Sequence, residues 1–286
     1  MIDLLCIGEV MGEIRHDATG FAMGYAGDTF NTAYYAHQAG AETHYFTRVG
    51  RDPLSDGLVA WMEDHGLTTE HVQRDDACNI GLYAVATDQK GERSFSYWRD
   101  QSAARLMFTD EETLPDARCI YVSGITLAIL MPDARRRLME QLAASDALIA
   151  FDSNYRPALW EDAQTARQTI AKMWSLAHIA LPSIDDEMAL YGEDDEQAVA
   201  ERFRQKAWQA CAIKRGDRGP VSLTLPEADF PASAYVVDTT AAGDSFNGAY
   251  LAAYLRGQSE EDCLMAGHTM ARHVVGHSGA IVPPPR

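Results

Sequence analysis

The stretch VVDTTAAGDSFNGAYLAAYLRG, residues 236–257, places a glycine and an aspartate at the start of an apolar segment. Phe246 and Tyr250 lie four positions apart on this segment, which predicts a helix whose first turn contains Gly243 and Asp244. In one interpretation, Asp244 is a capping residue that accepts hydrogen bonds from the free amides of that turn. In the other, those amides and the helix dipole bind a phosphate group, and Asp244 is a catalytic base beside it.

The composition is that of a folded, core-forming protein. The chain has 286 residues, of which 47% are hydrophobic and 23% charged, enough for one large domain or a domain with a small appendage. The formal net charge of −18 disfavours a nucleic-acid partner, because most of the surface would repel a phosphate backbone. Small anionic ligands stay compatible, since a few arginines in a cleft reverse the sign of the charge locally.

Cysteine usage indicates a reducing compartment. The five cysteines include no C-x-x-C pair, and Cys6, Cys119 and Cys211 lie in or beside apolar runs that predict buried strands. The first residues, MIDLLCIGEVMGE, lead into a strand without a basic region or a cleavage-type segment. No apolar run approaches the length that spans a bilayer. We therefore expect a cytoplasmic protein with no membrane partner.

Short apolar strands alternate with longer amphipathic segments. Strands are predicted at 4–8, 44–50, 119–124, 147–152, 178–183 and 211–216. Helices are predicted at 29–40, 54–66, 132–145, 161–177 and 195–210, besides the one that contains Gly243. This alternation predicts an α/β protein with a doubly wound, mostly parallel sheet covered by helices on both faces. Ligands of such sheets bind at the carboxyl ends of the strands.

Residues 79–100 interrupt the alternation. The segment NIGLYAVATDQKGERSFSYWRD predicts two strands around a turn at 87–92, with Gly91 at the bend. A hairpin with few helices to cover it is either a lid over the active site or a sheet that pairs with a second subunit. Its alternating aromatic residues are also compatible with an apolar face alone.

Two common nucleotide-binding motifs are absent from the sequence. No G-x-x-x-x-G-K-[ST] occurs, so the chain is not a P-loop enzyme. The first strand leads into GEVMGE, residues 8–13, which lacks G-x-G-x-x-G and gives a dehydrogenase little support.

Two long segments resemble the signatures of the ribokinase-like carbohydrate kinases. DTTAAGDSFNGAYLAAYL, residues 238–255, is similar to the C-terminal signature, with Ala241 in place of the usual first glycine. Residues 25–67, which begin YAGDTFN, are similar to the N-terminal signature, with Ala26 in place of a glycine. Two signatures in one chain are far more specific than either alone. The resemblance implies a ribokinase-like fold in a single domain, 1–286, with a small β-sheet lid inserted at about 10–26 and 78–101. It also implies a homo-oligomer, with a dimer formed through the lid.

Within that family, the chain most resembles the kinases of 2-keto-3-deoxygluconate. The matching pieces are IGEVMGEI (7–14), Gly27-Asp28, GERSFSYWRD (91–100), SGITLAIL (123–130) and FDSNYRPALW (151–160). The resemblance implies ATP-dependent phosphorylation of the 6-hydroxyl of this sugar acid. A fructokinase or other neutral-sugar kinase, a non-catalytic sugar-acid-binding protein and a dehydrogenase are the alternatives.

The resemblance also assigns roles to the opening stretch. Asp244 accepts the proton of the substrate hydroxyl as the oxygen bonds to phosphorus and orients it for in-line attack. The amides from Ala241 through Ala242 and Gly243 to Asp244 form an anion hole for the transferred phosphoryl group. For this role, we expect ordinary backbone angles at Ala241.

The sugar-binding residues implied by the resemblance come from two regions. Gly27, Asp28 and Asn31 line the hydroxyl side of the sugar, and Tyr83, Tyr97 and Arg99 contact the sugar acid from the lid. Arg156 lies between the sugar and the phosphates, as a substrate and catalytic residue. A guanidinium group binds a carboxylate through two parallel hydrogen bonds. Without the resemblance, each arginine reads as a solvated surface residue.

The nucleotide is assigned to AIKRGDRGPVSL, residues 212–223, together with the anion hole. The resemblance places ATP contacts at Lys214, Gly216, Asp217, Gly219, Ala241 and Gly243, with His268 bordering the adenine. A tight turn explains Gly-Asp-Arg-Gly equally well, and His268 is also compatible with a hydrogen-bonded helical histidine.

The predicted metal ligands depart from the family pattern. Kinases need Mg²⁺ to neutralise nucleotide phosphates. Ser183-Ile184-Asp185-Asp186 stands where the family often has Asn-x-x-Glu, so Asp186 takes the role of the acid and Ser183 that of the asparagine. Asp238 and Thr240 are the candidate ligands of a monovalent cation such as K⁺.

His273 and His277 lie four residues apart in the C-terminal segment. On a helix, this spacing places two imidazoles on one face, but no H-E-x-x-H accompanies them. We therefore do not predict a structural zinc site there.

Overall fold

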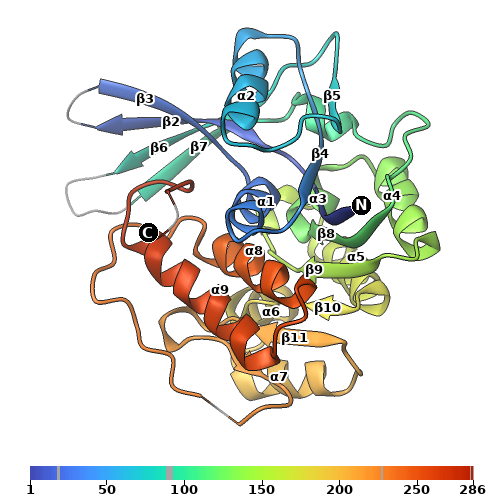
Figure 1. Ribbon diagram of the computed structural model, residues 1–286. Helices are drawn as coiled ribbons and strands as arrows, with labels where there is room; N and C mark the ends of the chain where they lie inside the picture. The colour runs from blue at the N-terminus through green and yellow to red at the C-terminus, as the bar shows by residue number, and fades with distance from the viewer. Residues whose placement is uncertain (18–19, 88–92, 227, 284, 286) are drawn as a thin grey trace.

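The computed structural model describes residues 1–17, 20–87, 93–226, 228–283 and 285. An eight-stranded sheet forms its centre, with all neighbouring strands parallel except β11 and β12. In spatial order, the strands are β12 (Val221–Ser222), β11 (Ala210–Ile213), β10 (Ile179–Ala180), β9 (Leu148–Asp152), β8 (Ala117–Ser123), β1 (Ile2–Ile7), β4 (Thr43–Val49) and β5 (Val72–Arg74). The predicted doubly wound, mostly parallel sheet is confirmed (Figure 1).

Helices cover both faces of this sheet, because successive side chains of a buried strand point to opposite faces. In β1, Leu4 and Cys6 belong to one hydrophobic core, and Leu5 and Ile7 to the other. The first core is closed by α1 (Asp28–Gln38), α2 (Pro53–Asp64), α8 (Ala242–Leu255) and α9 (Glu260–Val275). The second is closed by α3 (Gly124–Ile129), α4 (Pro132–Ala144), α5 (Ala163–Leu176), α6 (Ile184–Tyr191) and α7 (Glu196–Arg204). Three short 3-10 turns lie at Ala103–Leu106, Pro157–Leu159 and Gly216–Arg218.

Several predicted elements are shorter than expected. The strand predicted at 178–183 is reduced to β10, because Pro182 has no amide with which to continue the ladder. The helix predicted at 195–210 ends at Arg204. The C-terminal helix α9 ends at Val275, so His277 lies in the turn that follows the helix and not on it.

A second, four-stranded sheet projects from the body of the molecule (Figure 1). Its strands, in spatial order, are β3 (Gly20–Ala26), β2 (Met11–Asp17), β6 (Gly81–Thr87) and β7 (Arg93–Trp98). β6 and β7 are the predicted antiparallel hairpin, whereas the predicted bend at Gly91 lies outside the described residues. The parallel pairing of β2 with β6 joins two segments about 70 residues apart into one sheet. We refer to it as the lid sheet.

The cysteines are all free thiols, and Cys6, Cys119 and Cys211 are buried, as predicted. Within the described ranges, no helix combines the length and the apolar character that crossing a membrane requires.

Candidate active site

A cleft of about 960 Å³ lies between the lid sheet, the carboxyl ends of the main strands and the beginning of α8. All the predicted site residues except Asp238 line it, although they come from positions 27 to 268. This is the edge at which parallel α/β sheets bind their ligands. The two signature segments therefore meet in one cavity.

Asp244 faces this cleft and does not cap its helix. The N-cap of α8 is Ala241, and no side chain caps the helix there. One carboxylate oxygen of Asp244, Oδ2, accepts a hydrogen bond of 2.8 Å from Asn31 Nδ2. The capping interpretation of Asp244 is thus wrong. The amide of Ala242 donates to the carbonyl oxygen of Thr239 at 3.3 Å, whereas the amides of Gly243 and Asp244 lie at the positive end of the helix dipole without a side-chain cap.

Asn31 connects the two signatures. Its Oδ1 accepts a hydrogen bond of 3.3 Å from the amide of Gly27, while its Nδ2 donates to Asp244. Thr32 strengthens the same junction, because its hydroxyl donates to the backbone oxygen of Asp244 at 3.2 Å. A Cβ on Gly27 would lie 2.1 Å from the carbonyl oxygen of Glu9, so only glycine permits this close approach of two backbones.

The environment of Asp244 favours its neutral form. Burial, followed by repulsion from the Asp28 carboxylate, raises the pKa of Asp244 to about 7, although the hydrogen bond from Asn31 acts in the opposite direction. Burial likewise raises the pKa of Asp28, which accepts a hydrogen bond of 2.9 Å from Asn154 Nδ2. A carboxylate with a pKa near neutrality is suited to general-base chemistry.

The backbone of Ala241 differs from the prediction. Its φ of 60° and ψ of 13° lie in the left-handed region, where glycine is the usual residue, so the expected ordinary angles are wrong. The methyl group packs against Met11, Ala26 and Tyr83 at the base of the lid sheet. Packing of this methyl group offsets part of the cost of the left-handed conformation.

Ala241→Gly is expected to leave the free energy of unfolding within about 1 kcal/mol of wild type. Relief of the left-handed conformation contributes roughly 1–2 kcal/mol, and loss of the buried methyl group costs about 0.8 kcal/mol. The neighbouring Ala242→Gly is the matched control, because Ala242 is helical and the change should lower stability by about 0.5–1 kcal/mol. Urea unfolding of both proteins tests this, and an Ala241→Gly protein less stable than the Ala242→Gly protein would contradict it.

Both predicted arginines are held by carboxylates of the cleft. Arg99 is buried, 7% exposed, and donates through Nη2 to the buried Glu9. Arg156 is half exposed and its Nη1 lies 2.9 Å from Asp186 Oδ1. The interpretation of Arg99 as a solvated surface residue is wrong. Among the described residues, Arg99 Nε and Glu9 Oε1 are buried and have no hydrogen-bond partner.

Aromatic side chains of the lid sheet form the roof of the cleft. The rings of Tyr83 and Tyr97 lie 5.9 Å apart, and Phe95 extends the row. Tyr97 is 53% exposed, whereas the hydroxyl of the buried Tyr83 donates to Glu13 Oε1 at 2.6 Å. Tyr97 is therefore the tyrosine of this pair that is free to contact a ligand directly.

A buried polar network beneath the cleft was not predicted. Asp152, at the end of β9, accepts hydrogen bonds of 2.5 Å from Lys214 Nζ and 2.8 Å from Asn247 Nδ2. Lys214 also lies against the mouth of α8, because a Cβ on Gly243 would be 3.7 Å from its Nζ. The position of Asp152 at the end of a strand was a usable signal, whereas nothing in the sequence marks Asn247.

The remaining nucleotide candidates surround the other end of the cleft. Gly216 and Gly219 have φ values of 63° and 75°, and a Cβ on Gly219 would lie 2.3 Å from Cβ of Phe230. His268 is buried on α9, its Nε2 lies 3.0 Å from the carbonyl oxygen of Pro231, and its ring packs on Phe230. The turn and the hydrogen-bonded histidine are both present, and both line the cleft.

The predicted metal ligands are placed unequally. Asp186 lines the cleft, and burial raises its pKa while Arg156 opposes that shift. Glu187 beside it is fully buried and is bound by Arg202 and Trp174, so it is turned away from the cleft. Asp238 accepts hydrogen bonds from the amides of Thr240 and Gly279, at 2.7 and 3.0 Å. Its role as a ligand of a monovalent cation stays a prediction.

Comparison with known proteins agrees with this geometry. Residues 1–286 match the model of the pfkB family carbohydrate kinases. The chain is 37% identical to the 2-dehydro-3-deoxygluconokinase of Dickeya dadantii, over 98% of this chain and 97% of the relative. It is 36% identical to the 2-dehydro-3-deoxygluconokinase of Escherichia coli K12, over 97% and 96% of the two chains.

A solved structure confirms the ribokinase-like fold. The fructokinase of Vibrio cholerae O395, determined with fructose, ADP and a potassium ion, superposes with a TM-score of 0.85. The match covers 98% of this chain and 94% of that one at 20% sequence identity, so it speaks for the fold alone. The family match over residues 1–286 and the 37% identical relative show that the chain belongs to the pfkB family of carbohydrate kinases.

Proposed function

We propose that this chain transfers the γ-phosphoryl group of ATP to the 6-hydroxyl of 2-keto-3-deoxygluconate, which is also called 2-dehydro-3-deoxygluconate. The observation that carries the proposal is the Asn31–Asp244 hydrogen bond, which sets a carboxylate from one signature against the sugar loop of the other. The names of the relatives that match over nearly the whole chain support the choice of substrate.

Each step of the reaction has a residue suited to it. Asp244 orients the substrate hydroxyl and accepts its proton as the new O–P bond forms. The amides of Ala241, Gly243 and Asp244, at the positive end of the α8 dipole, stabilise charge on the transferred phosphoryl group, whereas the amide of Ala242 donates to Thr239. The ammonium group of Lys214 is placed beside Gly243, where it attracts the phosphates of the nucleotide.

The charges of the cleft suit a nucleotide bound with Mg²⁺. Cationic and acidic side chains both line the cavity, and the carboxylates include Asp152, Asp185, Asp186 and Asp244. Bound Mg²⁺ would neutralise phosphate charge, and carboxylate oxygens are the ligands that it prefers. Asp186 would hold the ion, with Ser183 beside it in the cleft. A monovalent cation at Asp238 and Thr240 is the corresponding proposal for K⁺.

Sugar acid binding is assigned to one wall of the cleft. Gly27, Asp28 and Asn31 face the sugar hydroxyls, and Tyr97 contacts the sugar from the lid sheet. Both arginines are paired with a carboxylate, but Arg99 is buried and Arg156 is half exposed, so Arg156 is the arginine better able to turn toward a substrate carboxylate.

A coupled assay of ADP release with ATP, Mg²⁺ and a panel of sugars tests the proposal. We expect turnover of 2-keto-3-deoxygluconate in preference to fructose and ribose, and the panel should include the galactonate epimer. Turnover of fructose or ribose but not of the keto-deoxy acid would establish the neutral-sugar kinase instead. Binding of the acid in calorimetry without ATP turnover would establish a non-catalytic binding protein.

Arg156→Gln is expected to lower kcat/KM for the sugar acid by about 30-fold. Hydrogen bonds to charged groups contribute about 1.5–3 kcal/mol, and tenfold in kcat/KM corresponds to about 1.4 kcal/mol. Arg136→Gln is the matched control, because Arg136 is a half-exposed arginine paired with Glu140 on α4. Steady-state kinetics that give Arg156→Gln, like the control, the wild-type kcat/KM for the acid would remove Arg156 from the substrate site.

The lid sheet also offers a surface for the proposed dimer. Tyr83 and Tyr97 point into the cleft, so the alternate residues of the same strands point to the outer face. On this outer face, Phe21, Met23 and Trp98 are 81%, 44% and 60% exposed. Exposed apolar groups at this density are typical of association surfaces. Light scattering that finds only monomers would contradict the dimer.

A cytoplasmic location of the protein stays a proposal as well.

A further inference from the structure

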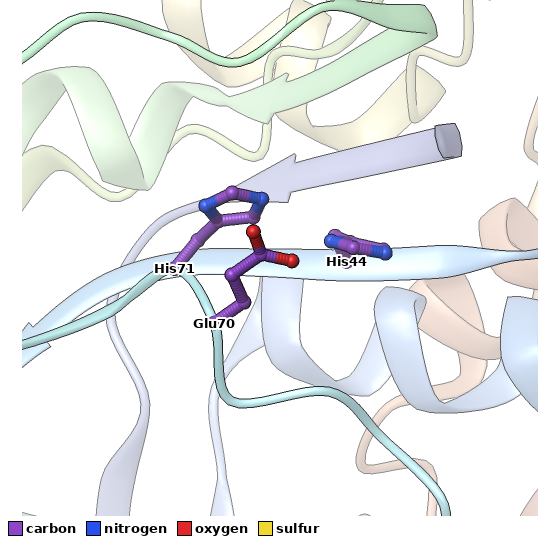
Figure 2. A group of neighbouring side chains, drawn as sticks. All are labelled: His44, Glu70 and His71. Atoms are coloured by element: carbon purple, nitrogen blue, oxygen red, sulfur yellow. The ribbon is translucent and has the colours of Figure 1, made fainter. Parts of the chain in front are cut away.

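Two histidines and a glutamate converge at the opposite edge of the main sheet. The candidate ligand atoms of His44, Glu70 and His71 all lie within 4.8 Å of one another, and the Glu70 carboxylate lies between the two imidazoles (Figure 2). His44 is in β4, and Glu70 and His71 directly precede β5. Among the described residues, these three form the group of at least three His, Cys, Asp or Glu side chains that are close enough together to hold a metal ion.

The cluster is remote from the cleft of the proposed kinase. It borders a cavity of about 440 Å³ that is also lined by Ile2, Glu42 and Asp116. These residues lie at or just before the beginnings of β1, β4 and β8, whereas the kinase cleft lies at the ends of the parallel strands. A ligand here therefore would not touch the phosphoryl-transfer site.

The imidazoles are prepared to act as ligands. His44 Nδ1 and His71 Nε2 are buried, and neither has a hydrogen-bond partner in the part of the chain that the structure describes. Buried polar nitrogens without partners are uncommon in folded proteins and call for an explanation.

We propose that His44, Glu70 and His71 bind a divalent transition-metal ion of the zinc type. The donor set is two imidazole nitrogens and one carboxylate oxygen. It suits Zn²⁺ better than Mg²⁺ or Ca²⁺, because the latter two ions favour oxygen ligands alone. Zn–N bonds of about 2.0–2.1 Å require ligand atoms roughly 3.3 Å apart. The exposed Glu70 side chain is free to close this distance. A water molecule would complete the coordination.

The bound ion would tie the loop before β5 to β4. β5 has three residues and is the last strand at its edge of the main sheet. Near it, His44 and Thr68 form one isolated bridge, and the amide of Thr47 donates to the carbonyl oxygen of His71 at 3.3 Å. A metal that joins both sides of this junction stabilises the folded chain, because it binds that state and not the unfolded one.

The second histidine pair of the chain is a natural control. The rings of His273 and His277 lie 4.5 Å apart, closer than the 5.1 Å between His44 and His71. His273 Nε2 lies 2.7 Å from the carbonyl oxygen of Pro283, and His277 Nδ1 lies 2.8 Å from that of His273. One nitrogen of each of these rings is therefore engaged by a backbone oxygen, unlike His44 Nδ1 and His71 Nε2.

The test is titration of the metal-stripped full chain with ZnSO4 in competition with a chromophoric chelator. We expect one Zn²⁺ per chain with a Kd below about 10 µM, and a rise in Tm of several degrees at saturation. His44→Gln and His71→Gln should each abolish both effects, and Glu70→Gln should weaken binding at least tenfold. His277→Gln should retain wild-type binding.

Visible absorption of bound Co²⁺ distinguishes a folded variant that has lost the metal site from a variant that does not fold. Tetrahedral Co²⁺ should give its characteristic bands in the wild-type and His277→Gln proteins and not in the folded His71→Gln protein. Zinc binding by the double His44→Gln/His71→Gln protein equal to wild type, or no stoichiometric binding by the wild type, would overturn the proposal. Because binding and Tm are read without substrates, failure here leaves the kinase proposal untouched.

Discussion

Asp244→Asn is expected to lower kcat by at least about 100-fold while binding of the sugar acid changes little. General-base catalysis contributes typically 10²–10⁴-fold, and asparagine cannot accept the proton. The Asn31 hydrogen bond of 2.8 Å can persist, because an amide oxygen also accepts, so the geometry of the cleft should survive. Steady-state kinetics and calorimetry measure the two effects separately. Full turnover by the variant would remove Asp244 from the role of base.

The same carboxyl group should set the acid limb of the pH profile. With the pKa of Asp244 raised to about 7, wild-type kcat/KM should fall as the pH drops below 7, because the protonated form cannot act as a base. The free energy of unfolding depends on pH in the opposite direction. Because the pKa of Asp244 is higher in the folded chain than in the unfolded chain, the folded chain loses stability as the pH rises toward 7 and the carboxyl group ionises beside Asp28. The Tm of Asp244→Asn should therefore be higher than that of wild type at pH 8, and the two Tm values should become similar near pH 4.

Gly248→Ala is expected to destabilise the protein by about 1–3 kcal/mol and to lower kcat/KM by about 10- to 100-fold. A Cβ on Gly248 would lie 2.5 Å from the carbonyl oxygen of Thr32 and 2.8 Å from the amide of Ala36, both in the backbone of α1. Overpacking of this kind costs typically 1–3 kcal/mol and outweighs the roughly 0.5–1 kcal/mol that alanine ordinarily adds to a helix. α1 carries Asn31 and α8 carries Asp244, so forcing the helices apart displaces the base.

Gly57→Ala is the control for Gly248→Ala. It is also a helical glycine, but the Cβ would meet the end of a side chain and not a backbone: the hydroxyl of Tyr25, at 2.4 Å, which donates to the carbonyl oxygen of Leu54. We expect a change in unfolding free energy within about 1 kcal/mol and wild-type kinetics. Urea unfolding and steady-state assays of both variants decide the matter, and a Gly248→Ala protein with wild-type stability and activity would contradict the role of this contact.

Local patterns were enough to predict the main elements. The apolar run at 4–8 and the amphipathic segment at 29–40 became β1 and α1 within two residues at each end, because periodicity reflects which faces are buried. Where one residue overrides the pattern, the prediction failed, as at Pro182. The strands β2 and β3, in turn, become a sheet only through pairing with β6, which no local signal reveals.

The residues predicted for the kinase site come from stretches that the sequence alone marks. Signature residues such as Gly27, Asn31 and Asp244 stand in short, recognisable stretches, and all of them line the cleft. Their partners were not predicted. Glu9 holds Arg99 from 90 positions away, and Asp152 holds Lys214 from 62 positions away.

The sequence by itself determined the doubly wound architecture, the free cysteines and the identity of the signature residues. These depend on the order of apolar and polar groups and on residue types, which are properties of the chain alone. Only the tertiary structure decided that Asp244 titrates near neutrality, that Ala241 adopts left-handed angles and that His44, Glu70 and His71 converge. Burial, electrostatic repulsion and ligand geometry depend on distances between groups that folding brings together from distant positions.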